Sequence, residues 1–155
     1  MSIRIESREN SLVKRLVRLS NDRKFRKEMQ EMVCEGEKML GEALSSGMDI
    51  HDILLAEDAE LDTELLRQAE GQGAKLYICP SSLLGKVSNV KTPQGVVFSC
   101  ERPVAELHVL QDAKRLMVLE GLQDPGNLGT IIRTADAFAL DGIILCEGCV
   151  DPTSP

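Results

Sequence analysis

The segment from Asp124 to Asp136 has the composition of an anion-binding site at the start of a helix. It reads Asp-Pro-Gly-Asn-Leu-Gly-Thr-Ile-Ile-Arg-Thr-Ala-Asp and follows an apolar run. Gly126 and Gly129 allow a backbone to approach a ligand closely, and the free N–H groups of a helix start favour an anion. The segment therefore predicts a loop and helix start that can bind a phosphate or a developing alkoxide.

Asn127 and Arg133 are the two polar side chains that could act in such a site. Asn127 can cap the helix or offer a neutral donor and acceptor to a substrate. Arg133 lies about 9 Å further along the helix axis, and helical side chains lean towards the N-terminus, so its guanidinium can reach back to the opening. The alternative is purely structural: a tight loop, a capping Asn127 and a surface Arg133.

Other nucleotide and metal motifs are weaker. The segment lacks both the Gly-x-Gly-x-x-Gly spacing and the Gly-Lys-Ser/Thr of a phosphate loop. Cys146 and Cys149 have C-x-x-C spacing, but one pair supplies only two ligands, and His51 and His108 are isolated. We expect no metal site, and reduced thiols that pack as small apolar groups.

Basic residues gather at the amino-terminal end. Residues 1–27 contain nine basic and three acidic side chains, whereas the rest of the chain contains nine basic and 22 acidic ones. A basic arm on an acidic body can follow a phosphate backbone, although a solvated helix face is the plain alternative. The candidates for phosphate contact are Lys14, Arg15, Arg18, Arg23, Lys24, Arg26 and Lys27.

Hydrophobic periodicity predicts an α/β fold. The order is two basic helices starting near residues 10 and 22, a short strand at 32–34, a helix at 36–44, a strand at 50–56, a helix at 62–70, a strand at 75–79, a helix at 81–87 and a strand at 95–100. A linker or peripheral segment over 101–113 then leads to a parallel β-loop-α-β unit, with strands at 115–120 and 142–145 and a helix from 127 to about 139.

The run from Leu119 to Ala135, with 142–145 and 148–152 after it, closely resembles the first motif of the SpoU (TrmH-like) family of RNA ribose 2′-O-methyltransferases. Upstream, Asn-Ser-Leu-Val-Lys at 10–14, Glu35-Gly36 before Glu-Ala-Leu, and Thr-Pro-Gln-Gly at 92–95 are similar to the substrate-binding domain of that family. The resemblance covers nearly the whole chain.

The resemblance implies two domains. Residues 1–104 would form a ribosomal-protein-like α/β/α domain that binds rRNA or tRNA, and 113–155 would begin a SPOUT-type knotted methyltransferase domain. Such enzymes transfer a methyl group from S-adenosylmethionine to a ribose 2′-hydroxyl, usually as homodimers. Asn127 would shape the active site, and Arg133 would engage the RNA phosphate and the target hydroxyl.

The later motifs of the family, which form the knot and hold S-adenosylmethionine, are expected beyond Pro155. We therefore expect this chain alone neither to bind the cofactor nor to methylate RNA; a stand-alone RNA-binding module is the alternative. No apolar run approaches the roughly 20 residues that cross a bilayer, and the first ten residues carry charges, which predicts a cytoplasmic protein without membrane contact.

Overall fold

The computed structural model describes residues 2–90, 92–103 and 106–155. They form two compact units, residues 1–102 together with Pro155, and residues 103–154. The first unit contains a five-stranded sheet and the second a two-stranded one, so the α/β class is confirmed.

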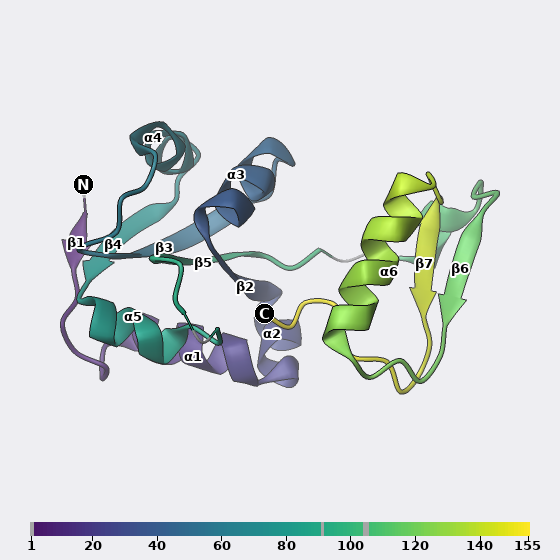
Figure 1. Ribbon diagram of the computed structural model, residues 1–155, viewed down its shortest axis with the longest axis horizontal. Coiled ribbons are helices and arrows are strands. Elements are labelled where there is room, and N and C mark those ends of the chain that lie inside the picture. The colour runs from purple at the N-terminus through teal and green to yellow at the C-terminus, as the bar shows by residue number, and fades with distance from the viewer. Residues whose placement is uncertain (1, 91, 104–105) are drawn as a thin grey trace. The chain divides into compact units, whose positions relative to one another are not determined.

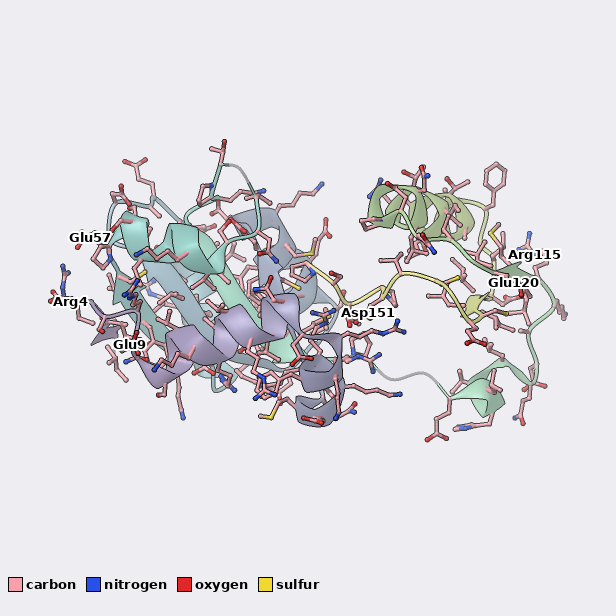
Figure 2. All side chains as sticks on the ribbon, turned by 90° about the horizontal axis from the view of Figure 1, so that it is seen from below. Arg4, Glu9, Glu57, Arg115, Glu120 and Asp151 are labelled. Carbon is pink, nitrogen blue, oxygen red and sulfur yellow. The ribbon has the colours of Figure 1, made fainter. Side chains whose placement is uncertain are left out.

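The first sheet is mixed, with parallel strands on one side and antiparallel strands on the other (Figure 1). Its strands in spatial order are β1 (Ile3–Arg4), β4 (Lys75–Cys79), β3 (Ile50–Ala56), β5 (Val96–Glu101) and β2 (Glu31–Glu35). Strand β1 was not predicted, because two residues cannot show alternation. It is held at the edge by its parallel pairing with β4 and by an ion pair from Arg4 to Glu57, 2.6 Å long (Figure 2).

Helices cover both faces of this sheet (Figure 1). One face carries α1 (Ser11–Asn21), α2 (Arg23–Met29) and α5 (Ser81–Val87), and the other carries α3 (Glu37–Ser45) and α4 (Thr63–Gly71). Alternation along β5 feeds both cores: Val97 packs with the α1 and α5 side, and Val96 and Phe98 pack with the α3 and α4 side. The result is a three-layer α/β/α unit.

The strongest sequence signals are confirmed with their boundaries. Strands 50–56 and 75–79 and the helix 81–87 lie where the pattern put them. Asn10 caps α1, its Oδ1 accepting from the backbone N–H of Leu12 at 2.9 Å. Asp22 caps α2 in the same manner, through the N–H of Phe25 at 3.0 Å.

Arg15 does not belong to the exposed side of α1, where the sequence pattern placed it. Its guanidinium forms an ion pair with Glu31 on β2 (2.9 Å) and a second with Asp52 on β3. Both carboxylate side chains are 10% exposed, so the arginine neutralises two nearly buried charges. His51 lies against the same group, with Nδ1 3.2 Å from Glu31 Oε1. Burial and the neighbouring Asp52 raise the pKa of Tyr77.

Arg26 is likewise turned inward. Its side chain is buried, and Nη1 donates to the backbone carbonyls of Leu19 at 2.7 Å and Ser20 at 3.3 Å. Those carbonyls belong to the last turn of α1, which lacks intrahelical donors. Arg26 therefore joins α2 to the end of α1, and the prediction that it is a surface cation is wrong.

The second unit is the predicted β-loop-α-β unit. It contains β6 (Leu116–Leu119), α6 (Pro125–Ala137) and β7 (Gly142–Leu145), and the two strands are parallel. The segment 101–113, predicted to be a linker or peripheral segment, begins one residue later than predicted, because β5 includes Glu101. It contains the short 3₁₀ helix Leu107–Leu110, and residues 104 and 105 lie outside the described residues. Leu110 packs so closely on Gly142 that a Cβ there would lie 2.7 Å from its Cδ2.

Among the residues that the structure describes, no helix is both long enough and apolar enough to span a bilayer.

Replacing Arg15 by Met should lower the free energy of unfolding by about 3 kcal/mol, because Asp52 would lose its ion-pair partner and Glu31 would keep only His51. The matched change Lys14→Gln, one position earlier on the exposed side, should cost about 0.5 kcal/mol at most. Urea unfolding followed by circular dichroism measures both. Equal midpoints for the two variants would contradict the structural role of Arg15.

Candidate functional site

Helix α6 begins two residues before the predicted position, at Pro125. Asp124 is its N-cap, and Oδ1 accepts from the backbone N–H of Asn127 at 2.6 Å. Proline suits the first helical position because its φ is already helical and it has no N–H to satisfy. Of the two roles considered for Asn127, capping is therefore wrong, and its exposed side chain remains available to a substrate.

Arg133 reaches back along α6, as predicted from the lean of helical side chains. Its Nη1 lies 3.6 Å from the point where a Cβ of Gly129 would stand, and Nη2 is 3.4 Å from Thr130 Oγ1. Gly129 thus leaves room for the guanidinium one turn earlier on the helix. Arg133 is exposed and has no ion pair with any carboxylate in the described ranges. Its charge is free for an external anion.

The loops that follow β6 and β7 are joined by backbone hydrogen bonds. Cys146 N–H donates to Leu119 at 2.8 Å, Gly121 N–H to Glu147 at 3.3 Å, and Val150 N–H to Leu122 at 2.8 Å. Gly121 and Gly148 both have positive φ, and a Cβ on Gly148 would lie 3.3 Å from the Cα of Gly121. Close backbone approach at this edge fixes the loop from which α6 starts.

The C-x-x-C pair belongs to the same junction. Cys146 is exposed and Cys149 is buried, and the Cys149 thiol donates to the carbonyl of Leu119 at 3.3 Å. Its packing at the strand end agrees with the structural interpretation preferred from the sequence. In the described part of the chain, no three His, Cys, Asp or Glu side chains gather as metal ligands.

The basic residues of the first unit fall into two groups. Arg15 and Arg26 are used inside the fold, whereas the other five candidates are exposed: Lys14, Arg18, Arg23, Lys24 and Lys27. Within the exposed group, Arg18 lies 4.0 Å above the centre of the Phe25 ring and 3.4 Å from Asp22. Lys14 contacts Glu9 at 2.6 Å, and this hydrogen bond lowers the pKa of Glu9.

Sequence reasoning missed the roles of Asp124 and Gly129. The Asp-Pro pair was a usable signal, since an N-cap acid followed by proline marks a helix start. No local signal showed that the Arg133 guanidinium lies beside Gly129, because this contact depends on which rotamer the arginine adopts.

Asp124→Ala should destabilise the start of α6 by about 1 kcal/mol, because the N–H of Asn127 loses its acceptor. Hydrogen–deuterium exchange of the peptide covering 125–137 should become about fivefold faster. Asp124→Ser keeps a capping oxygen and should exchange like the parent. Asp136→Ala, in the last turn, is the control, and equal exchange in it and in the Asp124→Ala variant would argue against the cap.

Both units match known families. Residues 10–97 match the MRM3-like substrate binding domain, and residues 114–155 match the SpoU rRNA Methylase family. The second match includes Asn127 and Arg133.

Relatives agree along nearly the whole chain. An uncharacterized tRNA/rRNA methyltransferase of Synechocystis is 38% identical over 152 residues, covering 97% of this chain and 55% of that protein. The 23S rRNA (guanosine(2553)-2′-O)-methyltransferase RlmP of Bacillus subtilis is 33% identical, covering 95% of this chain and 56% of that protein. The chain thus spans a little over half the length of these relatives.

A solved structure of an AdoMet-bound rRNA methyltransferase from Sinorhizobium meliloti is also similar. It matches with a TM-score of 0.84 and 29% identity, over 99% of this chain and 57% of the other. The chain belongs to the SpoU family, with an MRM3-like substrate binding domain at residues 10–97 and the SpoU segment at residues 114–155.

Proposed function

We propose that this chain supplies the RNA-binding unit and the arginine-bearing segment of an RNA 2′-O-methyltransferase that uses S-adenosylmethionine and acts on rRNA or tRNA. The observation that carries the proposal is the exposed guanidinium of Arg133, which lies beside Gly129 in the segment that matches the SpoU family and forms no ion pair within the described residues. The relatives support the reaction type, since RlmP is named for 2′-O-methylation of 23S rRNA.

Arg133 would hold the acceptor. A planar guanidinium can bind a phosphate with two hydrogen bonds and place positive charge beside the 2′-oxygen as that oxygen loses its proton. Arginine stays protonated in proteins, so it cannot itself remove the proton. Solvent or a neighbouring phosphate accepts it, and Asn127 orients the ribose through its amide.

We infer that the edge formed by the loops after β6 and β7 does not by itself hold a nucleoside. Ligands in open α/β sheets usually bind at the carboxyl ends of the strands. Here Leu119, Gly121, Leu122 and Val150 use their backbone groups to join the two loops to each other. S-adenosylmethionine, when bound, supplies the methyl group; we assign none of these residues to holding it.

The RNA would lie on the exposed basic residues of α1 and α2. The set proposed for phosphate contact is Lys14, Arg18, Arg23, Lys24 and Lys27, without Arg15 and Arg26, whose guanidinium groups serve the fold. The family resemblance also implies a homodimer, and exposed apolar side chains of the second unit such as Val118 and Phe138 are available to such a contact.

Arg133→Gln should remove one phosphate contact from RNA binding by this chain. The magnitude of the slope of log K against log salt should fall by about 0.7–0.9. The loss of affinity relative to the parent chain should therefore be about five- to eightfold larger at 0.1 M than at 1 M salt. Fluorescence anisotropy with a labelled rRNA hairpin measures this. Arg133→Lys should restore the slope. Arg115→Gln is the control, because Arg115 lies just before β6, at the end of that strand away from the start of α6, where it donates to the carbonyl of Ala139. An unchanged slope in Arg133→Gln would remove Arg133 from the RNA contact.

Titration calorimetry of S-adenosylmethionine into the chain 1–155 should show no saturable binding, because the loop backbone at the sheet edge is already paired. The mass of the chain is confirmed beforehand, and a complete SpoU methyltransferase serves as the positive control. Saturable heat would show instead that residues 1–155 hold the methyl donor.

A further inference from the structure

The two helical layers of the first unit carry opposite charge. The α3 and α4 layer has more acidic than basic residues. Its four glutamates are Glu37, Glu42, Glu64 and Glu70, and its two basic residues are Lys38 and Arg67. The α1, α2 and α5 layer exposes an excess of basic side chains, the five named above together with Lys86. Figure 1 shows these layers on opposite faces of the sheet. A polyanion is therefore attracted to one face and repelled by the other.

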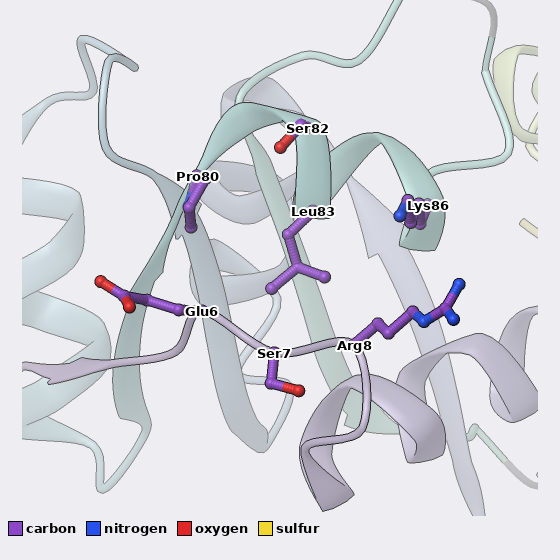
Figure 3. A pocket seen from close by; sticks show the side chains of 7 residues that line it. All are labelled: Glu6, Ser7, Arg8, Pro80, Ser82, Leu83 and Lys86. Atoms are coloured by element: carbon purple, nitrogen blue, oxygen red, sulfur yellow. The ribbon is translucent and has the colours of Figure 1, made fainter.

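A pocket of about 370 Å³ opens on the basic side, where the segment before α1 meets α5. Arg8 and Lys86 lie towards one end of it and Glu6 towards the other (Figure 3). Ser7 and Ser82 supply hydroxyl groups, and Pro80 and Leu83 form apolar wall. Two cations and two hydroxyls that line one small open pocket are donors suited to a phosphate group, and the Glu6 carboxylate lies towards the other end.

The positive charge of this pocket is poorly compensated. Lys86 has no ion pair with any residue of the described ranges. Arg8 is 3.7 Å from Glu9, but Glu9 is also shared with Lys14 at 2.6 Å, so one carboxylate serves two cations. Glu6 is occupied by Arg4, at 2.8 Å.

The hydroxyl of Ser7 is free to donate outward. Its oxygen accepts from the backbone N–H of Glu9 at 3.1 Å, which leaves its own proton for a ligand. Because α5 packs against α1, the pocket continues the basic surface that begins with Lys14 and Arg18.

We propose that this pocket binds one phosphodiester of the RNA backbone, through Arg8 and Lys86 with help from Ser7 and Ser82. The proposal rests on the proposed RNA-binding function and extends its surface from α1 and α2 onto α5. It assigns an RNA path across the α1, α2 and α5 layer and away from α3 and α4.

The test is the salt dependence of binding to a fluorescein-labelled rRNA hairpin by the chain 1–155. The double variant Arg8→Gln/Lys86→Gln should lower the magnitude of the slope of log K against log salt by about 0.7–0.9. Its loss of affinity relative to the parent chain should be about five- to eightfold larger at 0.1 M than at 1 M salt. The matched control Lys38→Gln/Arg67→Gln removes the same charge from the opposite face and should leave both quantities unchanged.

Ser82→Asp separates recognition from folding. Ser82 is exposed in the first turn of α5, where a carboxylate favours the helix, so this variant should be at least as stable as the parent. It should nevertheless weaken RNA binding by about the same factor, because the new charge repels the phosphate.

The outcomes are distinguishable. Normal binding by both pocket variants, with loss of binding in Lys14→Gln/Arg18→Gln, would overturn the pocket and keep the proposed function. Equal losses in the pocket and control variants would show that only net charge matters, and would also overturn it. No binding by the parent chain would remove both proposals.

Discussion

The arrangement of the first unit depends on the ion pairs of Arg15. Helix α1 supplies apolar residues to one core, but Glu31 and Asp52 bring two charges to the same face of the sheet with little contact to water. Burying those carboxylates without a cation would cost several kcal/mol. Arg15 therefore fixes the rotation of α1, and this rotation turns Lys14 and Arg18 outward. The basic surface is a consequence of how that charge problem is solved.

A different constraint governs the second unit, where backbone rather than side chains decides the geometry. Gly121 and Gly148 approach each other at a distance that a larger residue at Gly148 would disturb, and both have φ values that other residues rarely adopt. Their contact sets the loop in which Asp124 can cap α6. Gly129 then leaves space for the Arg133 guanidinium. Gly121, Gly148 and Gly129 thus help to position the charge of the Arg133 guanidinium.

Which features could be predicted from the sequence depends on how far apart in the chain the interacting residues lie. Strands 50–56 and 75–79 and the capping of α1 by Asn10 were predictable, because periodicity and caps are local. Arg15 and Arg26 were misplaced because their partners lie on other elements: strands β2 and β3 for one, and the end of α1 for the other. The pocket around Arg8 and Lys86 joins residues far apart in the sequence, so no local pattern could reveal it.

The proposed binding of RNA by an acidic chain is not a contradiction once distances are considered. The net charge of −7 acts over the whole molecule, but at physiological salt the field of an exposed charge falls off within about 8 Å. A phosphate in the pocket therefore senses Arg8 and Lys86, which line it, more strongly than the glutamates of α3 and α4 on the opposite face of the sheet. In the proposed complex the acidic layer would disfavour RNA bound to the α3 and α4 face, while the basic layer would favour RNA bound to the α1, α2 and α5 face.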